Sequence, residues 1–469
     1  MKPFTKFKSQ NEETRLSHFL TNQLGSKHFT YKQILSMLVP LILDQFFIFF
    51  IGTLTTFMIS ASGEDSVAAV TLVGPITFLI VALFSSVSAG GTVIVAQYKG
   101  KGDEKQMRRA AGQVVLTTFL VATIGSLILI LFAEPIINTL FHSADPTVKL
   151  KAKNYMIGIC LSNPAFSIFN GIFNVLRGVG DTKTCLRLTI VINVIHLFAS
   201  YLFINICKLD ILGTAISLNL ARFIGCAIAL YLILRPNDIL TLKLKDMFQF
   251  RWSIQKAIIK IGIPFSLEQV FFNLGRMLTQ VYMIQLGQSA IAADAIASSG
   301  SNLFYSAGFA VATLAITVVG QCIGAGDIKQ AKKYGKKLIG LGTVCMLISV
   351  AVLYPFMPLI IKLSNPSATI IPMIHQAMLI GVIAIPFFWS SSYVMPSVLR
   401  AGGDAGFTSI VSLVIMWIAR VALGYILAIT LGLGLNGMWI SMGVEWAARA
   451  IIFQIRFKGD KWHKKNLIA

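Results

Sequence analysis

The sequence predicts an all-α integral membrane protein with twelve transmembrane helices in two six-helix lobes, related by a parallel pseudo-two-fold repeat. Of the 469 residues 55% are hydrophobic and only 13% are charged, against about 25% charged residues in an ordinary soluble domain. The mean hydropathy is +0.75. Apolar segments of about 20 residues follow one another without the strand-period alternation of a membrane barrel, so helices must satisfy the backbone in lipid.

Twelve apolar segments are long enough to cross a bilayer as helices. They are predicted at 34–60, 67–96, 111–133, 150–176, 185–206, 212–234, 259–286, 292–320, 336–361, 370–399, 407–432 and 437–456.

The basic residues lie mostly in alternate connections between these segments. Of 40 Lys and Arg, 31 fall in the two termini and every second connection, five in the opposite connections and four within spans. This bias predicts a multi-pass protein of the cytoplasmic (inner) membrane with both termini in the cytoplasm. Because the charge is spread between apolar runs, the net charge of +21 does not indicate a nucleic-acid partner, and the lipid bilayer is the expected partner surface.

Three motifs recur in the same order in the two halves of the chain. Asp44 and Glu268 lie 224 residues apart, each four residues after a proline and just before a glutamine. The motif Gln97-x-x-Gly-x-Gly-Asp103 returns from Gln321, and Leu-Arg-x-x-Gly-Asp occurs from Leu176 and from Leu399. Six spans per half, an even number, give both halves the same orientation in the membrane.

The repeat predicts the domain organisation. We expect a cytoplasmic N-terminal segment 1–33, an N-terminal lobe 34–234, a cytoplasmic linker 235–258, a C-terminal lobe 259–456 and a cytoplasmic tail 457–469.

Asp44 and Glu268 are the first candidates for a functional site. An ionisable side chain within the bilayer costs roughly 2.5–3.5 kcal/mol or more, so it indicates a function by default. Gln45 and Gln269 are the expected neighbouring polar ligands. We expect both acids to lie in water-lined pockets where cargo and coupling ion take turns, which requires that no arginine holds them permanently.

Further polar residues within the predicted spans are weaker candidates. Arg420, His196 and Asn193 join the predicted substrate and coupling-ion site. A buried Arg222 needs a carboxylate partner, and the open candidates are Asp44, Asp210 and Glu268. Glu445 and Arg449, four residues apart on one helix, are expected to neutralise each other.

The recurring glycine motifs are interpreted as structural turns. Gly-x-Gly-Asp permits a tight turn whose aspartate caps the next helix. Leu-Arg-x-x-Gly-Asp is interpreted as a cytoplasmic turn with a local Arg–Asp contact. Six scattered cysteines without a C-x-x-C pair indicate neither a disulfide framework nor a metal site, and no cofactor is expected.

In combination these features resemble the multidrug and toxic compound extrusion (MATE) transporters over nearly the whole chain. The features are the two six-helix halves, the segment 63–70 after the first span, the motifs from Gln97 and Leu176, and Arg420 in the eleventh span. The resemblance implies a two-lobed bundle, open to one side at a time, that exports organic cations in exchange for H⁺ or Na⁺, and no enzymatic activity.

The chain departs from common patterns of that family at its ion sites. Thr55 stands where many members carry an aspartate in the first helix, and His196 and Ser200 stand where many carry Asn and Asp. No acid occurs between Lys362 and Asp404, where some Na⁺-type members have one. Asp44 and Glu268 are therefore the proposed substitutes, with Na⁺ near either acid as the alternative to H⁺.

Two function classes remain open from the sequence. The first is an antiporter for organic cations, expected as a monomer. The alternative is a flippase of a lipid-linked saccharide or related amphiphile on a similar fold, which needs a strongly cationic cavity. Because the predicted spans hold two well-placed acids and few arginines, cationic cargo is favoured.

Overall fold

The computed structural model describes residues 25, 27–60, 64–142, 145–236, 240–358, 361, 366–464 and 467–468. Most of the predicted N-terminal segment 1–33, and the side chain of Thr55, lie outside the described part. Within it, every regular element is helical.

The two halves of the chain form two helical lobes. The N lobe comprises α2 (Tyr31–Ser60), α3 (Glu64–Lys101), α4 (Glu104–Leu131), α5 (Ala133–Leu140), α6 (Pro146–Val179), α7 (Thr182–Ser200) and α8 (Asp210–Leu234). The C lobe comprises α10 (Trp252–Met283), α11 (Gln288–Gly324), α12 (Ile328–Leu353), α14 (Ile371–Ala384), α15 (Ser390–Ala401), α16 (Ala405–Ile415), α17 (Leu423–Tyr425) and α18 (Gly434–Lys458). The short α9 (Leu244–Phe248) lies between them in sequence and packs on α4.

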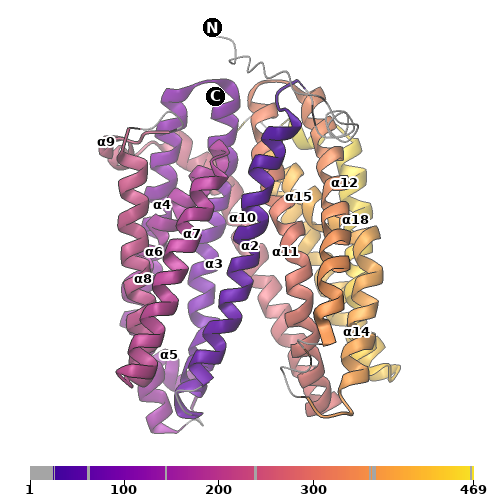
Figure 1. The fold of residues 1–469 in the computed structure, drawn as a ribbon. Coiled ribbons are helices and arrows are strands. Elements are labelled where there is room, and N and C mark those ends of the chain that lie inside the picture. Colours follow the sequence, from indigo (N-terminus) through magenta and orange to yellow (C-terminus); the bar gives the residue numbers. More distant parts are fainter. Residues whose placement is uncertain are drawn as a thin grey trace.

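The lobes stand side by side and diverge toward one end of the molecule (Figure 1). The start of α2, the end of α18 and α9 lie at the other end, which we call the terminal end; α5 lies at the divergent end, which we call the far end. Eleven helices among the described residues are long and apolar enough to cross a membrane. The predicted twelfth span corresponds to α18, a helix of 25 residues that carries Glu445 and Arg449 at its centre.

The first helix of each lobe contains a proline next to its acid. Pro40 lies inside α2 and Pro264 inside α10. A proline within a helix removes one backbone hydrogen bond and crowds the preceding turn, so the helix is locally distorted there. Both acids lie about one helical turn after this proline, Asp44 after Pro40 and Glu268 after Pro264.

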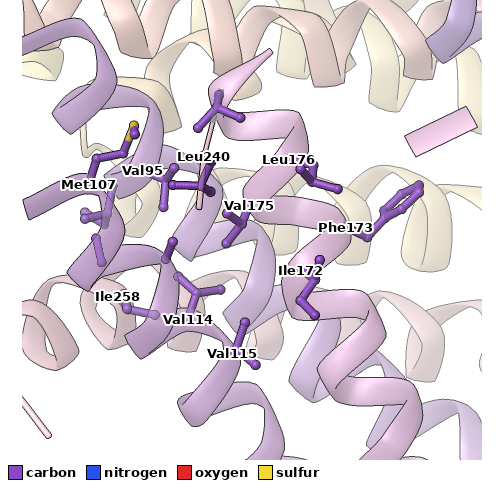
Figure 2. Packing of buried hydrophobic residues seen from close by; sticks show 14 of the residues in the cluster. Val95, Met107, Val114, Val115, Ile172, Phe173, Val175, Leu176, Leu240 and Ile258 are labelled. Carbon is purple, nitrogen blue, oxygen red and sulfur yellow. The ribbon is translucent and has the colours of Figure 1, made fainter. Parts of the chain in front are cut away.

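Each lobe's first helix begins in the hydrophobic core of the other lobe. The start of α2, from Ile34 to Leu41, belongs to a buried cluster built mainly from α11, α12, α15 and α18. Reciprocally, Ile254, Ile258 and Ile261 of α10 pack into an N-lobe cluster of α3, α4 and α6. Figure 2 shows Ile258 in that cluster together with Val95, Val114 and Leu176. The lobes are therefore tied together at the terminal end by exchanged helix starts.

The outer surface is apolar, as a bilayer requires. Large hydrophobic side chains such as Leu131, Phe198 and Phe387 expose 74, 69 and 70% of their surface, whereas polar groups such as Asp44 and Glu445 are fully buried. This distribution reverses that of a soluble protein and places the ionisable groups inside the bundle.

Candidate functional site

Asp44 is held by an arginine and a threonine inside the N lobe. Its Oδ2 accepts from Arg177 at 2.5 Å, and its Oδ1 accepts from the Thr189 hydroxyl. The Arg177 guanidinium also lies 4.3 Å from the centre of the Phe173 ring. The group joins α2, α6 and α7, and its carboxylate is fully buried. A buried carboxylate with a charged and a neutral donor is a satisfied ion pair.

Glu268 has the same kind of partners in the C lobe. Its Oε2 accepts from Arg400 at 2.5 Å and from the Ser409 hydroxyl at 2.8 Å. The Arg400 guanidinium lies 4.3 Å from the centre of the Phe265 ring and also donates to Thr408. The group joins α10, α15 and α16, the counterparts of α2, α6 and α7.

The two pairs overturn part of the sequence interpretation. In this conformer each acid faces an arginine where we expected cargo or a coupling ion, and Asp44 does not line the central cavity whereas Glu268 does. Arg177 and Arg400 were counted as loop residues, but α6 continues to Val179 and α15 to Ala401. Because side chains in a helix lean toward its N-terminus, an arginine in the last turn reaches back into the bundle.

A cavity of about 520 Å³ lies between the lobes, lined by residues of both. Of the predicted site residues, Gln45, Gln269 and Arg420 line it together with Glu268. His196 and Asn193 do not; the Asn193 amide donates to the backbone oxygen of Thr189 at 2.8 Å on its own helix. The volume falls in the range of sites for drug-sized molecules, about 300–1,000 Å³.

The cavity wall is richer in arginine than the sequence interpretation allowed. Five arginines line it: Arg177, Arg276, Arg400, Arg420 and Arg449. Two acids, Glu268 and Asp294, also line it, whereas Asp44 and Glu445 stand behind their arginines and do not. The expectation of few intramembrane arginines is therefore wrong.

Glu445 forms ion pairs with two of these arginines. It accepts from Arg420 at 2.6 Å and, as expected from their spacing, from Arg449 at 3.1 Å. Arg420 lies in a π-helical stretch, Met416–Ala422, and a second such stretch, Ile385–Trp389, carries Trp389. Wide turns of this kind occur often at functional sites because they re-aim side chains.

Aromatic side chains form one wall of the cavity. Trp389 stacks between Tyr305, at 5.7 Å, and Tyr393, at 4.7 Å between ring centres. Arg449 lies 4.7 Å from the centre of the Tyr393 ring. We missed this wall and the cavity acid Asp294 in the sequence, although an acid within an apolar segment is a signal of the same kind as Asp44.

The terminal end of the cavity is closed by reciprocal hydrogen bonds between the lobes. The Gln97 amide donates to the backbone oxygen of Ala401 at 2.7 Å, and the Gln321 amide donates to that of Gly178 at 3.1 Å. Each bond joins the glutamine motif of one lobe to the Leu-Arg motif of the other. Thr317 adds a bond to the backbone oxygen of Arg177 at 2.8 Å. We call this set the terminal gate.

Two glycines allow the backbones of α3 and α11 to touch within the gate. A Cβ atom on Gly100 would lie 1.9 Å from the backbone oxygen of Gln321, and one on Gly324 would lie 1.9 Å from that of Gln97. No side chain fits at either position without moving the lobes apart. The Gly-x-Gly-Asp motif thus has a role between lobes in addition to the predicted turn.

The predicted helix caps are confirmed. Gly102 and Gly326 have left-handed φ angles of 76° and 75°, and the aspartates after them accept from the backbone N–H groups of Gln106 and Gln330. The bond from Gln330 lowers the pKa of the Asp327 carboxyl, and His28 lowers it further.

The predicted Arg–Asp contact within the Leu-Arg-x-x-Gly-Asp turns is wrong. Asp181 caps α7 by accepting from the backbone N–H of Thr184, and Asp404 pairs with Arg456 at 2.7 Å. The arginines of both motifs are engaged by the acids of α2 and α10, because they point into the bundle and away from the turn.

The expectation that Arg222 pairs with a carboxylate is also wrong. Its guanidinium donates to Ser162 and Asn163 and lies 4.5 Å from the centre of the Phe166 ring. Neutral oxygens and an aromatic face satisfy this cation inside the N lobe. Among the described residues no cluster of three or more His, Cys, Asp or Glu could hold a metal ion.

A membrane bundle of two repeated lobes around a central cavity that is closed at one end has the architecture of an alternating-access transporter. The chain belongs to the MatE family, whose model matches residues 40–202 and again 264–426, once in each lobe. The protein is therefore a transporter and not an enzyme.

Two relatives and a solved structure illustrate the similarity. The chain is 25% identical over 437 residues to "Uncharacterized transporter YisQ" of Bacillus subtilis, covering 92% of this chain and 95% of YisQ. It is 24% identical to "Probable multidrug resistance protein NorM" of Thermotoga maritima, covering 93 and 94% of the two chains. Its fold matches the "Outward-facing conformation of a multidrug resistance MATE family transporter of the MOP superfamily" with a TM-score of 0.83 at 19% identity, covering 96% of this chain and 99% of that one.

Proposed function

We propose that this protein is an antiporter that exports drug-sized amphiphilic molecules across the cytoplasmic membrane in exchange for H⁺. The family match and the name of the Thermotoga relative, a probable multidrug resistance protein, support export of small molecules. A cavity of about 520 Å³ suits cargo of that size.

The orientation follows from the charge bias. The start of α2, the end of α18 and α9 lie at the terminal end (Figure 1). The connections on this side carry most of the Lys and Arg of the chain, and such an excess favours the cytoplasmic side. The closed gate then faces the cytoplasm and the lobes diverge toward the outside, so the conformer is outward-facing.

The observation that carries the proposal is the connection between the acid–arginine pairs and the gate. Arg177 reaches Asp44 with its side chain, while its backbone oxygen and that of Gly178 accept gate bonds from α11. In the C lobe, Arg400 pairs with Glu268, and the backbone oxygen of the next residue, Ala401, accepts the gate bond from Gln97. Each pair thus fixes the helix end on which the gate closes.

Protonation of the carboxylates would open this gate. A neutral carboxylic acid no longer attracts its arginine as an ion, so the ends of α6 and α15 lose their anchors and the closed gate loses stability. A ligand shifts a conformational equilibrium only by its differential affinity for the two states. Here the ligand is the proton, and it favours the inward-open state.

The same geometry favours H⁺ over Na⁺ as the coupling ion. A guanidinium nitrogen lies 2.5 Å from each carboxylate, and this positive charge repels a sodium ion from the same oxygens. A proton adds to a carboxylate oxygen without needing a cage of several ligands, whereas Na⁺ near Asp44 or Glu268 would require the arginine to leave first.

The alternative function, a flippase of a lipid-linked saccharide or related amphiphile, is favoured by one observation. Such cargo needs a cationic cavity, and five arginines line this one. The family match favours export of small molecules.

Transport by the purified protein in proteoliposomes tests the proposal. We expect export of a fluorescent amphiphile to follow an imposed pH gradient and to be indifferent to a sodium gradient. Asp44→Asn and Glu268→Gln should each abolish the dependence on pH. Transport driven by Na⁺ alone, or pH-driven transport in both variants, would contradict the proposal.

A further inference from the structure

The unusual feature of the central cavity is the excess of hydrogen-bond donors and positive charge on its wall. Five arginines line the cavity. Of the four buried acids near them, Glu268 and Asp294 line the cavity, and Asp44 and Glu445 do not. The N-lobe pair is neutral as a unit. The excess therefore lies in the C lobe, among Arg276, Arg400, Arg420 and Arg449.

Arg276 has no carboxylate to itself. It lies on α10 two turns after Glu268, and no hydrogen bond or ion pair of its guanidinium occurs within the described part of the chain. It interacts electrostatically with Asp294, which attracts it, and with Arg420, which repels it. Asp294 is already engaged, because its Oδ1 accepts from the Trp439 indole at 3.0 Å.

Arg420 and Arg449 share one acid. Glu445 is fully buried behind them, so two guanidinium groups face the cavity with a single negative charge on their far side. A buried anion acceptor placed between Arg276 and Arg420 would relieve their mutual repulsion and gain charge-assisted hydrogen bonds.

Two buried donors on the same wall lack an acceptor. The Nε1 of Trp446 and the Nε of Arg449 have no hydrogen-bond partner within the described part of the chain. Both residues line the cavity and expose only 1 and 3% of their surface. Each of these donors needs an acceptor that the protein does not supply, such as a water molecule or a ligand atom.

The aromatic wall supplies an apolar surface beside these donors. Trp389, which is 1% exposed, stacks between the half-buried rings of Tyr305 and Tyr393, and these half-buried rings offer apolar contacts to an aromatic ligand. The cavity therefore offers a cationic, donor-rich region next to a flat apolar one.

We propose that the C-lobe wall of the cavity is a binding site for organic anions, in which Arg276 and Arg420 hold a carboxylate, sulfonate or phosphate and the Tyr305–Trp389–Tyr393 stack holds an apolar body. This inference rests on the proposed export function and names its cargo class. It reverses the charge that the sequence interpretation assigned to the cargo, because Arg177 and Arg400 neutralise both predicted acids.

A matched pair of dyes tests the proposal. Fluorescein and rhodamine 123 share a xanthene body but carry opposite charges. We expect the full-length protein in lipid nanodiscs to bind fluorescein, measured by fluorescence anisotropy, with at least about tenfold higher affinity than rhodamine 123, since one charge-assisted hydrogen bond accounts for that factor.

Two variants place the anion on the C-lobe wall. Arg276→Gln should weaken fluorescein binding about tenfold or more and leave rhodamine 123 binding unchanged or stronger. The variant Arg420→Gln leaves Glu445 paired with Arg449, so no buried charge loses its partner; it should also weaken fluorescein binding. Lys329→Gln, an exposed lysine at the terminal end, is the control for net charge and should change neither affinity.

Nanodiscs with and without phosphatidylglycerol distinguish a soluble anion from a lipid headgroup. If fluorescein binds equally in both, the site takes soluble organic anions; if the anionic lipid competes, the site takes a lipid headgroup of the same charge. Preference for rhodamine 123, or unchanged fluorescein affinity in both variants, would overturn the proposal. If the anion proposal fails in this way, export of rhodamine 123 driven by a pH gradient would still support the antiport function. The antiport function itself would be contradicted if a pH gradient drove the export of neither dye.

Discussion

The two lobes carry the same acid–arginine pair but differ in all other buried charges. Asp44–Arg177 in the N lobe matches Glu268–Arg400 in the C lobe, at positions set by the repeat. Beyond this pair, the described spans of the N lobe bury only Arg222 among neutral partners, away from the cavity. The C lobe adds three arginines and an acid on the cavity wall and Glu445 behind it. In the proposed mechanism the repeated pair controls the conformational change, and the charges that are not repeated bind the cargo.

The pairs themselves are not identical. The hydroxyl partner of Asp44 is Thr189, the eighth residue of α7, whereas that of Glu268 is Ser409, the fifth residue of α16. The longer glutamate side chain thus meets a hydroxyl about one turn nearer the start of its helix. An aspartate in one lobe and a longer glutamate in the other therefore form the same kind of ion pair.

The largest expected effect is from breaking either pair. Asp44→Asn and Glu268→Gln each leave a buried arginine without its counter-ion, which costs about 3–5 kcal/mol. Because the lobes share this machinery, both variants should lose more than about 90% of pH-driven transport, a tenfold change that corresponds to 1.4 kcal/mol of lost coupling. Efflux in proteoliposomes checks this, with Lys329→Gln as the control. Full activity in one of the two variants would show that the repeat is not functionally symmetric.

The unrepeated arginines should separate stability from cargo binding. Arg222→Met removes a cation that has no carboxylate, so we expect a cost of only about 1–3 kcal/mol from its unpaired neutral partners and unchanged dye selectivity. Arg420→Met removes one of the two arginines that share Glu445 and leaves Glu445 paired with Arg449, so we expect a similar cost of about 1–3 kcal/mol but an altered dye selectivity. Thermal melting and dye binding measure both; altered selectivity in the Arg222 variant would break the comparison.

The gate glycines should act equally in the two lobes. Gly100→Ala and Gly324→Ala each place a Cβ against a backbone oxygen of the opposite lobe, and such overpacking costs about 1–3 kcal/mol. The conformer with the gate closed should lose that much stability, which raises the population in which the gate is open. Gly340→Ala on α12, where nothing lies within 4 Å of the added atom, is the control. Access of a thiol reagent to the cavity from the terminal end reports the shift, and equal access in all three variants would contradict the role of the gate.

The smallest expected effect concerns the helix caps at the gate. Asp327→Ala should lower the melting temperature slightly, because its carboxylate caps α12 and contacts His28. The pKa of this carboxyl is lowered in the folded state, so its contribution is present above the ordinary carboxyl pKa and disappears as the pH falls through the lowered value. The melting temperatures of wild type and variant should therefore converge in acid; a difference that grows in acid would contradict this assignment.

Much of the fold could be predicted from the sequence because bilayer thickness and the repeat constrain it. The spans, the two lobes and the matched acids all follow from apolar length and a fixed offset. The partners of the acids could not be predicted, because the apolar segments end before Arg177 and Arg400. In the structure α6 and α15 continue past these arginines, so both side chains reach back into the bundle. The aromatic wall was also not predictable, since stacked Trp389 and Tyr393 resemble lipid-facing bulk in a linear sequence.

The distance between the lobes at the terminal end tests the central claim most directly. Spin labels at Lys105→Cys and Lys329→Cys, both exposed at equivalent positions of the repeat, in a background without native cysteines, report whether the gate is closed. If the acid–arginine pairs hold it, the distance should lengthen as the pH falls, and the Asp44→Asn, Glu268→Gln double variant should show the long distance at every pH. A distance that ignores pH, or a double variant that retains the short distance, would contradict the account.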